Sequence, residues 1–129
     1  HPIAAAAGVA NLQFIDDHKL IAQAGEVGAY FNTAMADALC GHPNVGEVRG
    51  EGMLCAVELV RNADDAVFFD SSEKVGPRVA SAMLEQSNVI ARAMPQGDIL
   101  GFAPPFCLTR DDADEIVAAA VRAIDATLK

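Results

Sequence analysis

Two short apolar runs in the C-terminal half constrain the fold more than any other feature of the sequence. Val89–Met94 and Ile99–Ala103 each have the length of one strand, and Pro95–Asp98 separates them. The separating tetrapeptide Pro-Gln-Gly-Asp favours a turn, because proline presets its own φ and glycine tolerates a positive φ. Pro104 and Pro105 then end the second run, since they cannot continue a strand ladder. The sequence therefore predicts an antiparallel β-hairpin.

Helical periodicity surrounds this hairpin. In Lys19–Cys40 the apolar residues recur at intervals of three and four, and Gly41 follows as a stop signal. The last helix has Thr109 as a good N-cap, with Asp112 at the third helical position as a weak capping box. The four predicted helices cover Ile3–Ile15, Lys19–Cys40, Gly76 to about Ser87, and the residues from Thr109 to Leu128.

Two further strands are expected between the second and third helices. Val45–Arg49 is short and alternating, and Met53–Val60 is rich in residues that favour strands. The order is then helix, helix, strand, strand, helix, strand, strand, helix. This order predicts an α/β fold of the α+β sandwich type, with a small, mostly antiparallel sheet of three to four strands and helices on one side.

Composition excludes several classes of function. The 129 residues carry a net charge of −9, which argues against nucleic acid and anionic membrane surfaces as partners. No apolar run reaches the roughly 18 residues of a membrane helix, and the start of the chain is unlike a signal peptide, so we expect a cytoplasmic protein. The cysteines and histidines are scattered without ligand spacing. We therefore expect buried thiols and no metal site.

Three stretches are more specific than their composition. They are Val45–Met53 (VGEVRGEGM), Val89–Phe106 (VIARAMPQGDILGFAPPF) and Leu108–Val117 (LTRDDADEIV), and the opening residues His1–Ala5 add a fourth. In this order and spacing they resemble the C-terminal small domain of class III aminotransferases, the omega-amino-acid and amine–pyruvate group of fold-type I pyridoxal-phosphate enzymes. The resemblance covers essentially the whole chain.

The resemblance implies a reaction that needs more protein than this chain. Enzymes of this family move an amino group from an amine or omega-amino acid to a keto acid such as pyruvate, through a Schiff base on a lysine. That lysine lies upstream of the position matching His1, and Lys19, Lys74 and Lys129 have no matching context. No catalytic and no cofactor-binding residue is therefore expected here, and the fragment alone should be inactive.

The same resemblance implies partners and a division of the chain. A large domain of the same polypeptide, absent from this sequence, would bind the pyridoxal phosphate, and the whole enzyme would be a homodimer. Residues 1–40 are then expected to form a helical connector from the large domain, and residues 41–129 the small domain.

Arg92 is the residue most able to carry chemistry. It is the single charge in an otherwise apolar run, just before a turn. The resemblance implies that it binds the carboxylate of the substrate and swings away when the substrate is an amine. A guanidinium suits this role, because it presents a planar fork of donors and is permanently charged. The alternative is an ion pair with Asp98 across the hairpin. Pro95 is predicted to line the same pocket, with simple turn chemistry as its alternative.

Two other functions remain open from the residues alone. The chain could be a free-standing module that binds a small carboxylate, or a bare assembly domain. A module that evolved alone should have polar residues along one side of its first helix. Ile3–Ile15 is apolar nearly all round, which favours a helix with partners in a longer protein.

Overall fold

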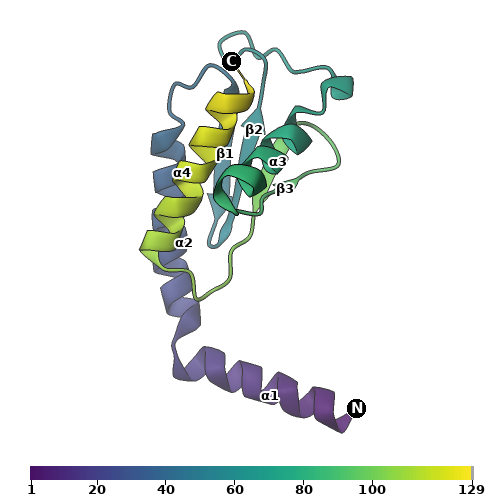
Figure 1. Ribbon diagram of the computed structural model, residues 1–129. Coiled ribbons are helices and arrows are strands. Elements are labelled where there is room, and N and C mark those ends of the chain that lie inside the picture. Colours follow the sequence, from purple (N-terminus) through teal and green to yellow (C-terminus); the bar gives the residue numbers. More distant parts are fainter. Residues whose placement is uncertain (129) are drawn as a thin grey trace.

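The computed structural model describes residues 1–128, and Lys129 lies outside the described residues. Helices and strands follow one another along the chain in the predicted order, with one additional 3₁₀ turn (Figure 1). The elements are α1 (Pro2–Asp17), α2 (Leu20–Ala38), β1 (Val45–Glu51), β2 (Leu54–Leu59), η1 (Ser71–Glu73), α3 (Val75–Ser87), β3 (Arg92–Ala93), β4 (Ile99–Phe102) and α4 (Arg110–Thr127).

Within residues 1–128 the strands form a four-stranded antiparallel sheet in the order β1-β2-β4-β3. Helices α2, α3 and α4 lie together on one face of this sheet (Figure 1). Burial follows the two-residue period of a strand. On β4, Leu100 and Phe102 are buried, whereas Ile99 and Gly101 are only half-buried. The predicted α+β sandwich is confirmed, with one covered face and one open face.

The core lies between the covered face and the helices. Phe31 and Met35 of α2, Val57 of β2, Leu100 of β4 and Ile124 of α4 are all fully buried. Complete burial of such side chains contributes about 1.5–3 kcal/mol each. Helix α2 therefore shares one core with the sheet and the C-terminal helix.

Helix α2 comes very close to the β1–β2 hairpin because small residues meet there. A β-carbon on Gly28 would collide with the backbone of Gly52. The side-chain amide of Asn32 donates hydrogen bonds to the carbonyls of Gly28 and Gly52, both at 2.9 Å. Position 52 also favours glycine because of its backbone conformation: φ is +55° in the tight turn.

The last helix begins as predicted. The Asp112 amide donates to the Thr109 hydroxyl at 3.2 Å, and the Thr109 amide donates to the Asp112 carboxylate at 3.0 Å. This reciprocal capping box satisfies amides that the helix itself leaves unpaired. The hydrogen bonds from Thr109 hold the pKa of Asp112 below its usual value.

The strands differ from prediction in length. Strand β1 is two residues longer than expected, because it pairs as far as the tight turn that Met53 helps to form. Strand β3 is only Arg92–Ala93 instead of Val89–Met94. In the continued register Ile90 and Val89 would lie opposite Ala103 and Pro104, beyond the end of β4 at Phe102. The predicted turn is confirmed: the Met94 amide donates to the Ile99 carbonyl at 2.9 Å.

Helix α1 is different from the rest of the molecule. It extends away from the packed body (Figure 1), and Ile3, Leu12 and Phe14 are 75%, 67% and 55% exposed. None of the residues of α1 is buried, although the helix is as apolar as predicted. No helix within residues 1–128 has the length and apolar character to cross a membrane.

The cysteines are only partly as expected. Cys55 is buried on the covered face, where burial raises the pKa of its thiol to about 11. Cys40 and Cys107 are exposed, so the expectation of buried thiols is wrong for them. Cys40 follows α2 and Cys107 follows the two prolines, and both are loop positions whose exposure their spacing does not reveal.

Candidate functional site

One row of residues crosses the open face of the sheet. Arg92 on β3 pairs with Gly101 on β4, Gly101 pairs with Ala56 on β2, and Ala56 pairs with Arg49 on β1. The residues next to them on the same strands, such as Leu100, point into the core. The row therefore has an arginine at each end and almost no side chain between them.

Arg49, at one end of the row, is held by two carboxylates. Its guanidinium contacts Glu47 at 2.7 Å and Glu58 at 2.8 Å. The hydrogen bond with Glu58 is the main reason that the pKa of Arg49 lies above its usual value. Glu58 stands on β2, which has a neighbouring strand on each side. Arg49 is therefore an ion-pair residue.

Arg92, at the other end, has no such partner among residues 1–128. It is exposed, and it takes part in none of the ion pairs or side-chain hydrogen bonds of that part of the chain. The alternative pairing with Asp98 is not found. The Asp98 carboxylate instead accepts a hydrogen bond from the Gly76 amide at 2.7 Å. The guanidinium of Arg92 is thus available to a ligand on the open face.

A shallow cavity of about 380 Å³ lies on the open face between the two arginines. We call it the trough. Its volume falls in the range of small-molecule sites. Pro95 lines it, but Arg92 does not. That Pro95 lines a substrate pocket together with Arg92 stays a prediction. The lining residues are Arg49, Ala56, Met94, Pro95, Gln96, Ile99 and Gly101.

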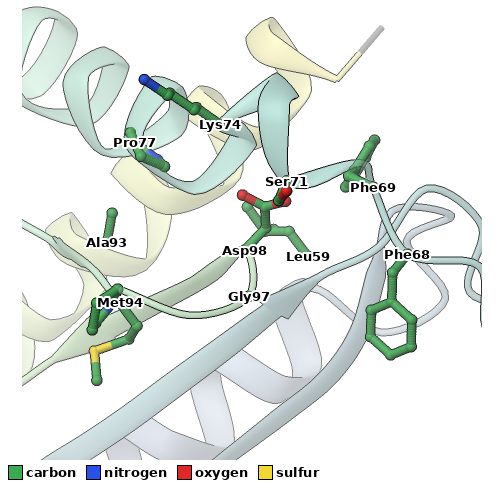
Figure 2. Close-up of a pocket in the computed structure, with 11 residues that line it drawn as sticks. Leu59, Phe68, Phe69, Ser71, Lys74, Pro77, Ala93, Met94, Gly97 and Asp98 are labelled. Atoms are coloured by element: carbon green, nitrogen blue, oxygen red, sulfur yellow. The ribbon is translucent and has the colours of Figure 1, made fainter.

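A second cavity of about 610 Å³ lies on the other side of the β3–β4 turn, next to the start of α3 (Figure 2). Pro95 and Met94 line this cavity too. Asp98 projects into it, and its carboxylate takes the Gly76 amide in the first turn of α3. The Lys74 ammonium points away from Asp98 (Figure 2). An acid at the positive end of a helix removes the attraction that would hold an anion there.

Sequence reasoning did not identify Gly101, Ala56 and Met94 as parts of this region. One signal for Gly101 was present: an isolated glycine inside a strand pattern often marks a place where another group approaches closely. Ala56 and Met94 gave no comparable signal, because their place beside Arg92 depends on strand register. Residues 1–128 contain no cluster of histidine, cysteine and acidic residues that is placed to hold a metal ion.

Solved structures share this architecture. A transaminase studied by directed evolution and ancestral reconstruction superposes with a TM-score of 0.95 at 53% identity, over 98% of this chain and 28% of that one. An (S)-enantioselective omega-transaminase from Thermomicrobium roseum superposes with a TM-score of 0.90 at 31% identity, over 100% of this chain and 28% of that one. The fold is that of a part of fold-type I transaminases.

Sequence comparison agrees. Residues 1–124 match the family Aminotransferase class-III. The chain is 51% identical over 125 residues to the diaminobutyrate–2-oxoglutarate transaminase of Halomonas elongata, covering 97% of this chain and 26% of that protein. It is 30% identical over 127 residues to the putrescine–pyruvate aminotransferase of Pseudomonas aeruginosa, covering 98% of this chain and 27% of that protein. The chain belongs to the class-III aminotransferase family and spans about a quarter of the length of these relatives.

Proposed function

We propose that this chain is the C-terminal part of an aminotransferase that moves an amino group from an amine or omega-amino acid to a keto acid such as pyruvate. In this proposal Arg92 binds the carboxylate of the substrate. The observation that carries it is the exposed guanidinium on the open face, unpaired within residues 1–128, in a chain of the class-III family. Pro95 would line the substrate pocket from the turn beside it.

The physics of a guanidinium fits this role. It can form two parallel charge-assisted hydrogen bonds with a carboxylate, and bonds of this type contribute about 1.5–3 kcal/mol. That free energy corresponds to roughly a ten- to hundredfold change in binding. The long, flexible stem of Arg92 would let one site accept both a keto acid and an amine without a carboxylate.

We also propose how the chain sits within the longer protein. Residues 1–40 would be the helical connector, and residues 41–129 the small domain. The α2 half of the connector packs on the sheet, and the exposed apolar α1 half would pack against the remainder of the protein. A free-standing carboxylate-binding or assembly module is the less favoured alternative, since α1 would then leave its apolar side chains in water. The full protein would be a cytoplasmic homodimer.

Class-III aminotransferases imply pyridoxal phosphate as cofactor. The residues of this chain do not fit that group. The pocket that combines a lysine with a helix N-terminus already has Asp98 on the Gly76 amide, and this carboxylate repels a phosphate. The cofactor would therefore be bound by the large domain, outside this chain, and only substrate binding and orientation belong to the residues described here.

The test uses the full-length enzyme loaded with pyridoxal phosphate. Arg92→Ala should lower kcat/KM for pyruvate about 10- to 100-fold, because the charge-assisted hydrogen bonds to the carboxylate are lost. The value for an amine without a carboxylate should change little. Arg122→Ala is the matched control, since it removes an exposed arginine from α4 on the covered side. Equal losses for the keto acid and the amine would remove Arg92 from the carboxylate role.

A further inference from the structure

We propose that Asp98 is a positioning residue for the substrate site. Its carboxylate caps α3 from outside that helix and thereby fixes the turn that follows Arg92. This inference rests on the proposed function, because it concerns how the carboxylate-binding arginine is held in place. Asp98 does not line the trough. It lies in the cavity on the other side of the turn (Figure 2), so it acts through the backbone of the turn and not by contact with the substrate.

Helix α3 has no cap from its own N-terminal residues. Its N-cap residue is Lys74, which makes no side-chain hydrogen bond to the first turn, and a lysine side chain has no acceptor atom. Gly76, the second residue of the helix, is buried, so its amide needs an acceptor within the protein. The Asp98 carboxylate supplies this acceptor at 2.7 Å, and its negative charge suits the positive end of the helix. Asp98 therefore serves as the N-cap from 22 positions away.

The main chain of Asp98 is bonded to a second element. Its carbonyl accepts a hydrogen bond from the amide of Leu59, at the end of β2, at 2.8 Å. Leu59 is fully buried, as are Val75 and Val79 of α3. In contrast, the three turn residues before Asp98, Pro95–Gly97, are exposed. Asp98 is therefore the residue that joins this exposed turn to two elements of the core.

The strand that carries Arg92 is short and depends on this turn. Strand β3 consists of Arg92 and Ala93, and it pairs with β4 at the edge of the sheet. One further hydrogen bond, from the Met94 amide to the Ile99 carbonyl at 2.9 Å, closes the turn. Because Ile99 follows Asp98 directly, a movement of Asp98 would displace the acceptor of this hydrogen bond and the end of β3 with it. The position of Arg92 is thus linked to the cap on α3.

The first experiment compares two substitutions in the full-length enzyme loaded with pyridoxal phosphate. Asp98→Ala removes the acceptor, whereas Asp98→Asn keeps a side-chain oxygen for the Gly76 amide and removes only the charge. We expect Asp98→Ala to raise KM for pyruvate about 10-fold, the lower end of the effect of one hydrogen bond to a charged group, while kcat changes less than about twofold. KM for a carboxylate-free amine should stay near that of the parent, and Asp98→Asn should restore most of the value for pyruvate. Equal losses in the two variants would contradict positioning, because the charge itself would then be what matters.

A double-variant cycle shows whether Asp98 acts through Arg92. When Arg92→Ala is already present, Asp98→Ala should add no further loss for pyruvate, since the side chain to be positioned is absent. A loss that persists in full in this background would overturn the inference, because Asp98 would then affect the substrate by another route. The proposed function fails separately, if Arg92→Ala alone affects pyruvate and the amine equally.

Amide hydrogen exchange tests the positioning without any substrate. In Asp98→Ala the amide of Met94 should exchange at least about 10-fold faster than in the parent, because the turn opens more often. The amide of Val57, in the core of β2, should keep its parent rate. An unchanged rate at Met94 would show that Asp98 does not hold the turn, and the inference would fall whatever the value of KM.

Thr109→Ala is the matched control, because it removes the N-cap of another helix, α4. It should leave the ratio of kcat/KM for pyruvate to that for the amine unchanged. If Asp98→Ala fails to fold, Asp98→Ser takes its place. The serine hydroxyl lies one bond closer to the backbone than a carboxylate oxygen, so it cannot meet the Gly76 amide at the same distance. The same selective rise in KM for pyruvate is expected, and no rise with Asp98→Ser would rule out the positioning role.

Discussion

The two faces of the sheet use neighbouring residues in opposite ways. On β4, Leu100 is fully buried under the helices, while Gly101, one position later, forms part of a shallow trough on the other side. The covered face is made of apolar side chains from the strands and three helices. The open face has an ion-pair cluster, an arginine with no ion-pair partner in residues 1–128, and room between them. A strand of period two can thus place stability on one side and recognition on the other.

The open face itself contains a second contrast. Arg49 and Arg92 stand in the same row, yet the first is held by two carboxylates and the second extends into solvent. An arginine therefore belongs to an ion-pair cluster at one end of the row, whereas the arginine at the other end has no ion-pair partner in the described part of the chain. What separates them is the presence of acids on the neighbouring strand positions.

The largest expected effect concerns the covered face. Leu100→Ala should lower the free energy of unfolding by about 2–5 kcal/mol, because it leaves a cavity in the core. The same truncation of its neighbour, Ile99→Ala, should lower it by about 1 kcal/mol or less, since Ile99 lines the open trough. Urea unfolding followed by circular dichroism measures both. Equal losses would show that the two faces are not energetically distinct.

The cysteines give a chemical version of the same contrast. Cys55 on the covered face should react with iodoacetamide at pH 8 at least about 100-fold more slowly than Cys40, because its thiol is buried and its pKa is about 11. Mass spectrometry of labelled peptides from the native chain measures the rates. In urea the two rates should become similar. A native Cys55 that labels as fast as Cys40 would mean that the covered face opens readily.

A smaller effect is expected where α4 begins. Thr109→Ala should lower the free energy of unfolding by about 1 kcal/mol through loss of the N-cap hydroxyl. Because Thr109 lowers the folded-state pKa of Asp112, this carboxylate stabilises the fold above its unfolded pKa and stops doing so as pH falls through its folded pKa. Without Thr109, the acid side of the stability profile should be flatter. An NMR titration should show the pKa of Asp112 rising, and an unchanged value would contradict the capping box.

The smallest effect is expected for the held arginine. Glu58→Gln should lower the free energy of unfolding by about 0.5–1 kcal/mol, as is typical of partly exposed ion pairs. Arg49 keeps its contact with Glu47 in this variant. Urea unfolding at low and high salt measures the change, which should shrink as salt increases. A loss as large as that of Leu100→Ala would mean that the open face carries stability as well.

The elements most open to prediction were those whose signals are local. The capping box of Thr109 and Asp112 and the four-residue turn after Met94 were both predicted from the residues and confirmed. Strand ends were less predictable, because they depend on pairing with residues elsewhere in the chain: β3 is only Arg92–Ala93, and its partner β4 ends at Phe102. The pairing of Asp98 was open for the same reason: the Gly76 amide that it accepts from is 22 positions away in the chain.

The candidate site divides in a similar way. Arg92 stood out as one charge in an apolar run, and its role in binding a carboxylate is a proposal that the sequence motivated. Its neighbours Gly101 and Ala56 did not stand out, since only the pairing of three strands brings them beside it.

The sequence by itself determined the class of fold, the identity of its helices and the arginine of interest, because periodicity, caps and turn residues act within a few positions of the chain. Only the tertiary structure decided which arginine is held by carboxylates and which has no such partner within residues 1–128, and where open space remains. Those properties depend on strand order and register, and distant residues set these through the core that they share.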